Sequence, residues 1–264
     1  MTMYLNTVRW RKEFGVDHAY KSFQFPEKKE VLKIFPQYYL RTDKFGRPIY
    51  INEVGKINVE ALLKVTTVER MIQFHVYEWE KLIRDMYPKC STHVGHKIFQ
   101  SFSIIDLKGL SYKQFNKTTR SFLKQITKID QENYPEHLGQ MFIINAPKTF
   151  SMIWSVVKLW LDKRTLAKIK VYGSDYHEKL FGFVDPHDLP EHIGGHLDLE
   201  EAMFSTSNIW DAEEMKQMLE GVANIKFGDI GEDSPNLSPE SNHSRERGST
   251  DYYDAQTDFT GGEE

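Results

Sequence analysis

The chain has 264 residues, with 34 Lys and Arg against 38 Asp and Glu, a formal net charge of −4 and a single cysteine. This length suits one α/β domain with appendages, and a lone cysteine excludes an internal disulfide, which fits a reducing, cytoplasmic compartment. The residues from Asp229 onward hold ten acids and two arginines, a net charge of −8, so residues 1–228 carry +4. A part this weakly basic can approach an anionic membrane but does not indicate nucleic-acid binding.

The first predicted element is a short amphipathic helix. Tyr4, Leu5, Val8 and Phe14 recur at helical spacing among basic residues, and Gly15 is expected to end the helix. No apolar run typical of a signal peptide opens the chain. The longest apolar stretch, 150–161, is far shorter than the roughly 20 residues of a membrane-spanning helix. We therefore expect a soluble protein.

A strand and a capped helix follow. Residues 47–52 (RPIYIN) come after a turn at 43–46 and read as the second arm of a hairpin. Thr66 and Thr67 are expected to cap a helix, with Glu69 completing a capping box from Thr66. One face of this helix is expected to be apolar, formed by Val68, Ile72, Val76, Trp79, Ile83 and Met86.

Strands and helices then alternate. Residues 98–106 (IFQSFSIID), 140–145 (QMFIIN) and 169–173 (IKVYG) have the composition of buried strands. Between the first two we expect a helix capped by Ser111 and Gln114, with an apolar face formed by Phe115, Phe122, Ile126 and Ile129. Further helices are expected at 150–161 and 176–183. Strands separated by helices indicate βαβ units and a largely parallel sheet.

The C-terminal part differs in composition. Residues 200–219 are expected to form a terminal helix or strap. From Gly228 onward the chain is rich in Ser, Gly and acidic residues and poor in aliphatic ones, so it is expected to be disordered.

Two segments have unusual patterns. The stretch 150–161 is apolar on nearly every side of a helix, so it is either a buried core helix or a lid that covers a cavity and meets a membrane. Ser101 and Ser103 lie on the same side of one strand, because strand side chains alternate. Their hydroxyls are either satisfied core groups or donors to a phosphate.

No catalytic or metal-binding pattern stands out. Cys90 has no Arg six residues later, where His96 stands, so an inert buried thiol is favoured. Histidines at spacings that suit a metal are His93 with His96, and His187 with His192 and His196, but HExxH and cysteine-pair patterns are missing. The phosphate-binding loops and the nucleophile elbow are missing too. We expect neither an enzyme nor a metal site.

Several ordered segments resemble the CRAL-TRIO lipid-binding family, and most closely the fungal phosphatidylinositol/phosphatidylcholine transfer proteins. The segments are 35–39 (FPQYY), 42–44 (TDK) with 46–48 (GRP), 105–109 (IDLKG), 134–136 (YPE), 143–147 (IINAP), and 189–190 (LP) with 194–195 (GG). Together they span about residues 3 to 200. The resemblance implies a mixed, largely parallel sheet that floors a hydrophobic cleft for one phospholipid, under a mobile helical gate.

The resemblance also implies site residues. The phosphatidylcholine headgroup is expected at Tyr39, Tyr50, Ser101, Ser103 and Tyr134, where aromatic faces suit a quaternary ammonium. The phosphatidylinositol headgroup is expected at Glu136, His137, Thr165 and Lys168. His137 stands where the family usually has Arg, so inositol-lipid binding is expected to strengthen as pH falls. The gate and acyl-chain lining are expected to include Phe150, Ile153, Trp154, Val157 and Leu161.

The resemblance finally implies a domain plan and a role. A family helix that bears an Arg-Lys pair should precede Met1, so the chain is expected to be shortened, with 1–27 as a remnant of that helical region. The lipid-binding domain is expected at 28–200, a helix or strap at 201–227 and an acidic tail at 228–264. The expected role is cofactor-free phospholipid transfer by a monomer that contacts Golgi or endosomal membranes transiently and supports phosphoinositide signalling and vesicle traffic. A non-transferring scaffold that recruits a protein partner is the alternative.

Overall fold

The computed structural model describes residues 2–197 and 252–254. The helices are α1 Thr2–Phe14, α2 Val16–Ser22, α3 Lys28–Ile34, α4 Val59–Val65, α5 Val68–Lys81, α6 Tyr87–Val94, α7 Lys117–Asn133, α8 Phe150–Val157, α9 Lys163–Ala167 and α10 His177–Phe183. The strands are β1 Gln37–Thr42, β2 Pro48–Asn52, β3 Ser101–Asp106, β4 Leu138–Ile144, β5 Ile169–Tyr172 and β6 Tyr252–Asp254.

The strands form one mixed sheet with spatial order β1-β2-β3-β4-β5-β6. The neighbours β2, β3, β4 and β5 are parallel, while β1 and β6 pair antiparallel at the two edges. The parallel strands are joined by helical crossovers, as the alternation of strand and helix patterns predicted. The α/β fold class is therefore confirmed.

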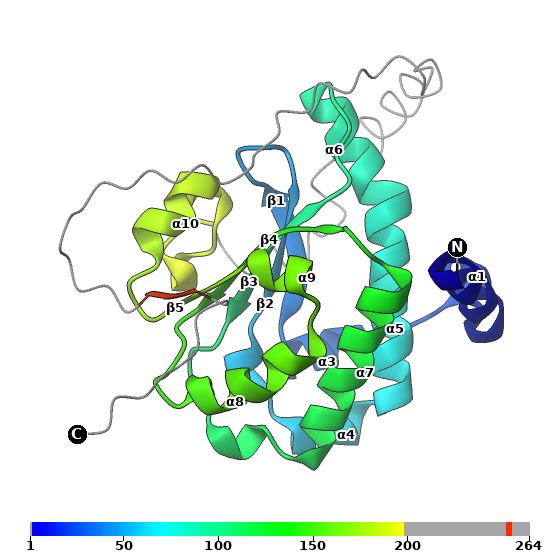
Figure 1. Cartoon of the computed structure of the whole chain (residues 1–264), viewed down its shortest axis with the longest axis horizontal. Coiled ribbons are helices and arrows are strands. Elements are labelled where there is room, and N and C mark those ends of the chain that lie inside the picture. The colour runs from blue at the N-terminus through cyan, green and yellow to red at the C-terminus, as the bar shows by residue number, and fades with distance from the viewer. Residues whose placement is uncertain (1, 198–251, 255–264) are drawn as a thin grey trace.

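Helices cover both faces of the sheet. In Figure 1, α10 lies on one side and α5 and α7 lie on the other, with α8 crossing below. The α10 side is a dense core of Tyr38, Ile51, Ile104, Phe142 and Leu180, all at most 4 % exposed. The side under α5, α7 and α8 is packed less completely, so a cavity remains on this side of the sheet.

The hairpin at the start of the sheet depends on local contacts. A carboxylate oxygen of Asp43 accepts hydrogen bonds from the backbone N–H groups of Phe45 and Arg47, and the Arg47 guanidinium pairs with the other oxygen at 2.7 Å. Gly46 has φ 77°, a left-handed conformation that favours glycine. The turn expected at 43–46 is thus confirmed.

The two predicted helix caps are confirmed in part. Helix α5 is capped by Thr67, whose hydroxyl accepts from the N–H of Arg70, while the Thr66 hydroxyl donates to Glu27. The box of Ser111 and Gln114 exists, but it caps a 3₁₀ turn, and α7 begins later with Asn116 as its N-cap. Capping residues recur every few positions here, so the sequence alone marks the region of a helix start and not the residue.

The expected apolar face of α5 is only partly right. Val76 is buried as predicted, but Met71, Phe74 and Glu80, outside the predicted stripe, are also buried. The reason is that α5 contacts both α2 and α7, so two of its faces are covered.

Some expectations lie outside the described residues. These are the helix or strap at 200–219 and the tail from Gly228, apart from three residues. Within the region expected to be disordered, Tyr252–Asp254 pairs with β5 as the edge strand β6, which corrects that expectation for these residues.

Candidate functional site

The floor of the candidate site is a row of residues that runs across five strands. Tyr39 pairs with Tyr50, Tyr50 with Ser103, Ser103 with Met141, and Met141 with Ile169. Paired residues in adjacent strands point to the same face of a sheet. The row therefore presents two phenols and a hydroxyl, followed by apolar groups, to the side covered by α5, α7 and α8.

Above this floor lies a cavity of about 630 Å³. Its roof is formed by α5, α7 and α8, and α9 lies at one end. Apolar groups from the roof and floor that line it include Phe74, Phe122, Ile126, Trp154, Val157, Ile105 and Ile143. A cavity with this lining suits a ligand with long apolar parts.

All five residues expected at the phosphatidylcholine headgroup line this cavity: Tyr39, Tyr50, Ser101, Ser103 and Tyr134. The rings of Tyr39 and Tyr50 lie side by side, with centroids 5.0 Å apart. The Tyr50 hydroxyl donates to Gln37 Oε1 at 2.9 Å, and burial raises the pKa of both phenols. The tyrosines are therefore neutral near pH 7.

The two serines differ in their contacts. Ser101 Oγ donates to the backbone carbonyl of His137 at 3.4 Å, a long hydrogen bond. Ser103 is 5 % exposed, yet its hydroxyl has no hydrogen-bond partner among the described residues. A buried hydroxyl that borders a cavity and lacks a partner is available to a ligand.

Tyr134 is held by a buried charge network. Its hydroxyl donates to Glu80 Oε1 at 2.9 Å, and Glu80 also pairs with Arg11 and Arg84, each at 2.8 Å. Burial alone would raise the pKa of Glu80, but hydrogen bonds from Arg11 and Tyr134 bring it below its usual value. The network therefore connects α1 to one wall of the cavity through a carboxylate that stays ionised.

The mouth of the cavity is charged. Lys168 Nζ and Arg164 Nη1 each lie 3.3 Å from a different carboxylate oxygen of Glu136. These partners, Lys168 first, hold the pKa of Glu136 below its usual value. The Thr165 hydroxyl donates to Asp162 at 2.6 Å, and Asp162 is the N-cap of α9. Three of the four residues expected at the inositol headgroup thus line the mouth, with Arg164 as an addition that the sequence analysis missed.

His137 is the exception. Its side chain is not among those that line the cavity; it stacks on Tyr87 with ring centroids 5.6 Å apart, and Nδ1 lies 3.0 Å from the Phe99 carbonyl. Burial lowers the pKa of His137 below 6.5. His137 thus packs away from the cavity lining, and its imidazole is neutral at physiological pH.

The expected gate residues divide into two groups. Trp154, Val157 and Leu161 line the cavity, whereas Phe150 and Ile153 are buried against Leu107 and Ile143. The opposite side of this segment is open, with Met152 52 % and Leu159 77 % exposed. Its all-round apolar pattern is therefore explained by three surroundings: core, cavity and solvent.

A polar group in the roof of the cavity was not predicted from the sequence. His75, Glu78 and Asp130 line the cavity on the inward stripes of α5 and α7. His75 Nε2 lies 2.6 Å from Asp130 Oδ1, and Trp79 Nε1 donates to the same oxygen at 2.8 Å. The available signal was Asp130, an acidic residue four positions after Ile126 on the stripe that begins with Phe122.

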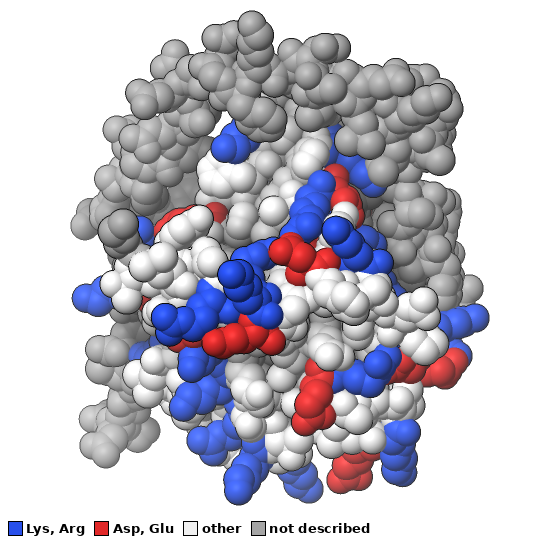
Figure 2. All heavy atoms as spheres, turned by 90° about the vertical axis from the view of Figure 1, so that its right-hand side faces the viewer, with Lys and Arg blue, Asp and Glu red and all other residues white. Residues whose placement is uncertain are grey.

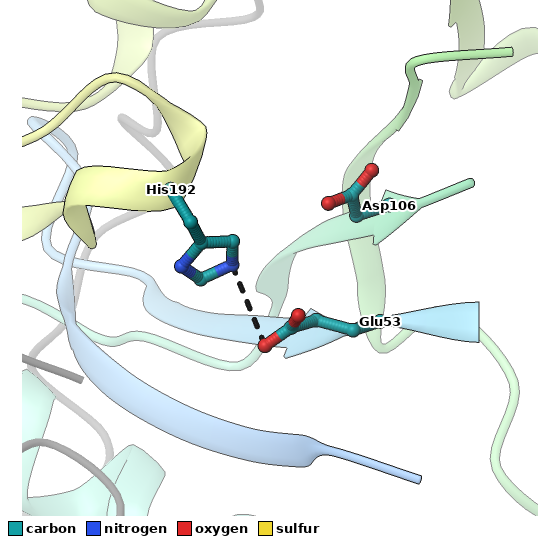
Figure 3. A group of neighbouring side chains, drawn as sticks. All are labelled: Glu53, Asp106 and His192. Carbon is teal, nitrogen blue, oxygen red and sulfur yellow. Dashed lines mark ion pairs between the residues drawn. The ribbon is translucent and has the colours of Figure 1, made fainter. Parts of the chain in front are cut away.

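Three side chains of the types that bind metals meet on the α10 side of the sheet. Ligand atoms of Glu53, Asp106 and His192 all lie within 4.8 Å of one another, and Figure 3 shows His192 pointing toward Glu53. Lys56 Nζ, however, lies 2.5 Å from Glu53 Oε2, and His192 Nε2 lies 3.4 Å from Oε1. Because Lys56 already pairs with Glu53, and Asp106 accepts from Asn145 Nδ2 at 2.8 Å, we assign no metal to the cluster. His187, grouped with His192 by spacing, instead lies beside His196, with ring centroids 4.9 Å apart.

Cys90 is fully buried, and burial raises the pKa of its thiol to about 12, which suits an inert side chain. Among the described residues, no helix is long and apolar enough to cross a membrane. Figure 2, which shows the face with α1, α5 and α7, has Lys and Arg side chains interspersed with Asp and Glu over its described part. This mixed pattern differs from the continuous basic stripe of a nucleic-acid-binding surface.

Comparisons with known proteins agree with this geometry. The family description "CRAL/TRIO domain" matches residues 32–195. The chain is 47 % identical over 193 residues to the SEC14 cytosolic factor of Yarrowia lipolytica, which covers 73 % of this chain and 39 % of that protein. It is 40 % identical over 195 residues to the Sec14 cytosolic factor of Schizosaccharomyces pombe, covering 74 % of this chain and 68 % of that protein.

A plant relative and a solved structure extend the comparison. The phosphatidylinositol/phosphatidylcholine transfer protein SFH4 of Arabidopsis thaliana is 42 % identical over 219 residues, 82 % of this chain and 36 % of that protein. The chain thus spans less than half the length of the Yarrowia and Arabidopsis proteins. The crystal structure of Sfh5 shares the fold, with a TM-score of 0.60, 16 % identity, and coverage of 85 % of this chain and 77 % of that one.

Proposed function

Because the chain belongs to the CRAL/TRIO domain family, we propose that it binds one phospholipid in its cavity and transfers that lipid between membranes. The observation that carries the proposal is the floor row, in which Tyr39, Tyr50 and Ser103 stand side by side beneath an apolar space of about 630 Å³. The relatives named as phosphatidylinositol/phosphatidylcholine transfer proteins support it.

Phosphatidylcholine is the first proposed cargo. The faces of Tyr39 and Tyr50 attract its quaternary ammonium. The hydroxyls of Ser101 and Ser103 donate to its phosphate, which would otherwise be buried without partners, and Tyr134 borders the headgroup with its ring. The acyl chains occupy the apolar space between the floor and α7, with Trp154, Val157 and Leu161 against them.

Phosphatidylinositol is the second proposed cargo, bound at the mouth. Arg164 and Lys168 supply positive charge for its phosphate, and Glu136 holds both side chains in place. Thr165, in α9, lines the same mouth beside them. We leave His137 out of this site, because its imidazole packs against Tyr87, away from the cavity lining.

Exchange follows from a balance of similar energies. Burial of roughly 30 CH₂ groups contributes about 0.8 kcal/mol each, whether the chains lie in the bilayer or in the cavity. The difference between the two environments is therefore small, and polar contacts to the headgroup select the lipid. The exposed Met152 and Leu159 on the outer side of the gate suit transient contact with a membrane surface.

In this proposal the protein acts as a monomer at the cytoplasmic faces of Golgi or endosomal membranes. It requires no cofactor, metal or catalytic step. Native mass spectrometry of the purified chain tests lipid binding directly, and transfer of labelled phosphatidylcholine between vesicles tests transport. Bound phospholipid together with transfer is the expected result. Bound lipid without transfer would point to a lipid sensor. Empty protein that does not take up lipid from vesicles would favour a scaffold that recruits a protein partner.

A further inference from the structure

Two acidic side chains border the cavity beside apolar residues of the same helices. Asp130 follows Phe122, Leu123 and Ile126 on the inward stripe of α7, and Glu78 follows Met71 and Phe74 on that of α5. The Glu78 and Asp130 side chains are 22 % and 32 % exposed, so each carboxylate is partly removed from water, where a charge costs free energy unless a partner compensates it. Their position therefore calls for a functional reason.

The contacts of Asp130 leave part of its carboxylate free. Oδ1 accepts from Trp79 Nε1 at 2.8 Å and lies 2.6 Å from His75 Nε2. Oδ2 has no partner among the described residues. Trp79 also stacks on Tyr134 with ring centroids 5.1 Å apart, so the group that holds Asp130 is itself fixed. Asp130 is thus oriented by one oxygen, while the other is available to a ligand.

The charged groups around Asp130 determine the electrostatic potential in this part of the cavity. Glu78 is matched by Lys28 Nζ at 3.4 Å, from the neighbouring helix α3. The opposite floor offers Tyr39, Tyr50, Gln37 and Asn52, none of which carries a charge near pH 7. Glu78 and Asp130 both lie within electrostatic reach of the two phenols. Asp130 is bonded to His75 and Trp79 through Oδ1, so Oδ2 is the carboxylate oxygen left for a cation near the aromatic pair.

We propose that Asp130, positioned by His75 and Trp79, is the counter-charge for the cationic nitrogen of a phospholipid headgroup held against Tyr39 and Tyr50. The cavity accordingly selects headgroups with a positive nitrogen, such as choline and ethanolamine, over a bare phosphate. This inference rests on the proposed phospholipid binding and deepens it. Aromatic faces and a carboxylate together attract a cation more strongly than either alone, because both act on it across a poorly hydrated space.

The test is a selectivity measurement on the full chain. Wild type and Asp130→Asn are incubated with vesicles of equimolar phosphatidylcholine, phosphatidylethanolamine and phosphatidic acid with identical acyl chains, re-isolated, and analysed by native mass spectrometry. Asparagine keeps an oxygen acceptor for Trp79 and removes only the charge. The ratio of bound phosphatidylcholine to phosphatidic acid should fall about tenfold, a change of about 1.4 kcal/mol. The ratio of phosphatidylcholine to phosphatidylethanolamine should stay constant.

Glu132→Gln is the matched control, because it removes the same charge from the same helix. Glu132 is 60 % exposed and not among the lining residues, so its ratios should equal those of wild type. Asp130→Ser is a second arm, expected to shift the same ratio if the asparagine variant folds poorly. An unchanged ratio in a folded Asp130 variant would overturn the inference while phospholipid binding stands. A wild type that takes up no lipid would instead overturn the proposed function.

Discussion

Ser103→Ala separates the lipid site from the fold. The Ser103 hydroxyl has no partner among the described residues, although the side chain is 5 % exposed, so its removal breaks no internal hydrogen bond. A hydrogen bond to a charged group contributes about 1.5–3 kcal/mol. At about 1.4 kcal/mol per factor of ten, loss of the contact with phosphate should weaken phosphatidylcholine binding about 10- to 100-fold.

The same substitution should leave stability unchanged or slightly higher. Alanine keeps the Cβ packing against its neighbours and removes a hydroxyl that makes no hydrogen bond within the described part of the protein. We expect the free energy of unfolding to stay within about 0.5 kcal/mol of wild type or to rise, a shift of no more than about 2 °C in Tm for a domain of this size.

Two assays on the same preparations check this prediction. Equilibrium loading from phosphatidylcholine vesicles, read by mass spectrometry, gives the change in binding, and thermal unfolding of lipid-free protein gives the change in Tm. Ser103→Thr keeps a hydroxyl that borders the cavity and should restore binding. The double variant Ser101→Ala with Ser103→Ala should bind more weakly still. A Ser103→Ala protein that loads like wild type, or one that unfolds several degrees earlier, would show that the hydroxyl belongs to the core and not to the site.

Three further predictions concern the gate, the buried network and pH. Val157→Asp should reduce transfer between vesicles more than it lowers Tm, because Val157 lines the cavity and a carboxylate is costly beside acyl chains. A large loss of Tm with transfer intact would mark the helix as core. Arg11→Ala should lower the free energy of unfolding, measured by chemical denaturation, by about 2–3 kcal/mol, because the buried Glu80 keeps only Arg84 of its two arginines. A change below about 0.5 kcal/mol would contradict this expectation. Burial lowers the pKa of His137 in the folded protein, so the unfolded chain takes up a proton first as pH falls through about 6.5. The free energy of unfolding should therefore fall below about pH 6.5, and its dependence on pH should be shallower in His137→Gln. Phosphatidylinositol loading should be the same at pH 7.5 and pH 6, contrary to the expectation from sequence, and stronger loading at pH 6 would restore His137 to the site.

Much of the fold followed from local patterns. The strand segments around residues 101–106, 138–144 and 169–172 were recognisable because their apolar runs are short and separated by helical periods. The prediction that Ser101 and Ser103 share a face needed only the two-residue period of a strand, and both line the cavity. The resemblance to CRAL-TRIO proteins supplied the aromatic pair, and the strand register then placed Tyr39 beside Tyr50.

Other features were decided by tertiary structure. His137 and Glu136 are neighbours in sequence, yet one packs against Tyr87 and the other pairs with Lys168, because Glu136 has φ 64° and the chain turns sharply between them. Asp130 was hidden within a helix, and only the packing of α7 against α5 brings it to His75 and Trp79.

The sequence by itself determined which segments are strands and helices and which side chains share a strand face, because these depend on backbone geometry over a few residues. The tertiary structure decided which helix faces border the cavity, and therefore which charges meet a ligand. That choice depends on how whole elements rotate and pack against one another, and contacts between residues as distant as His75 and Asp130 fix it.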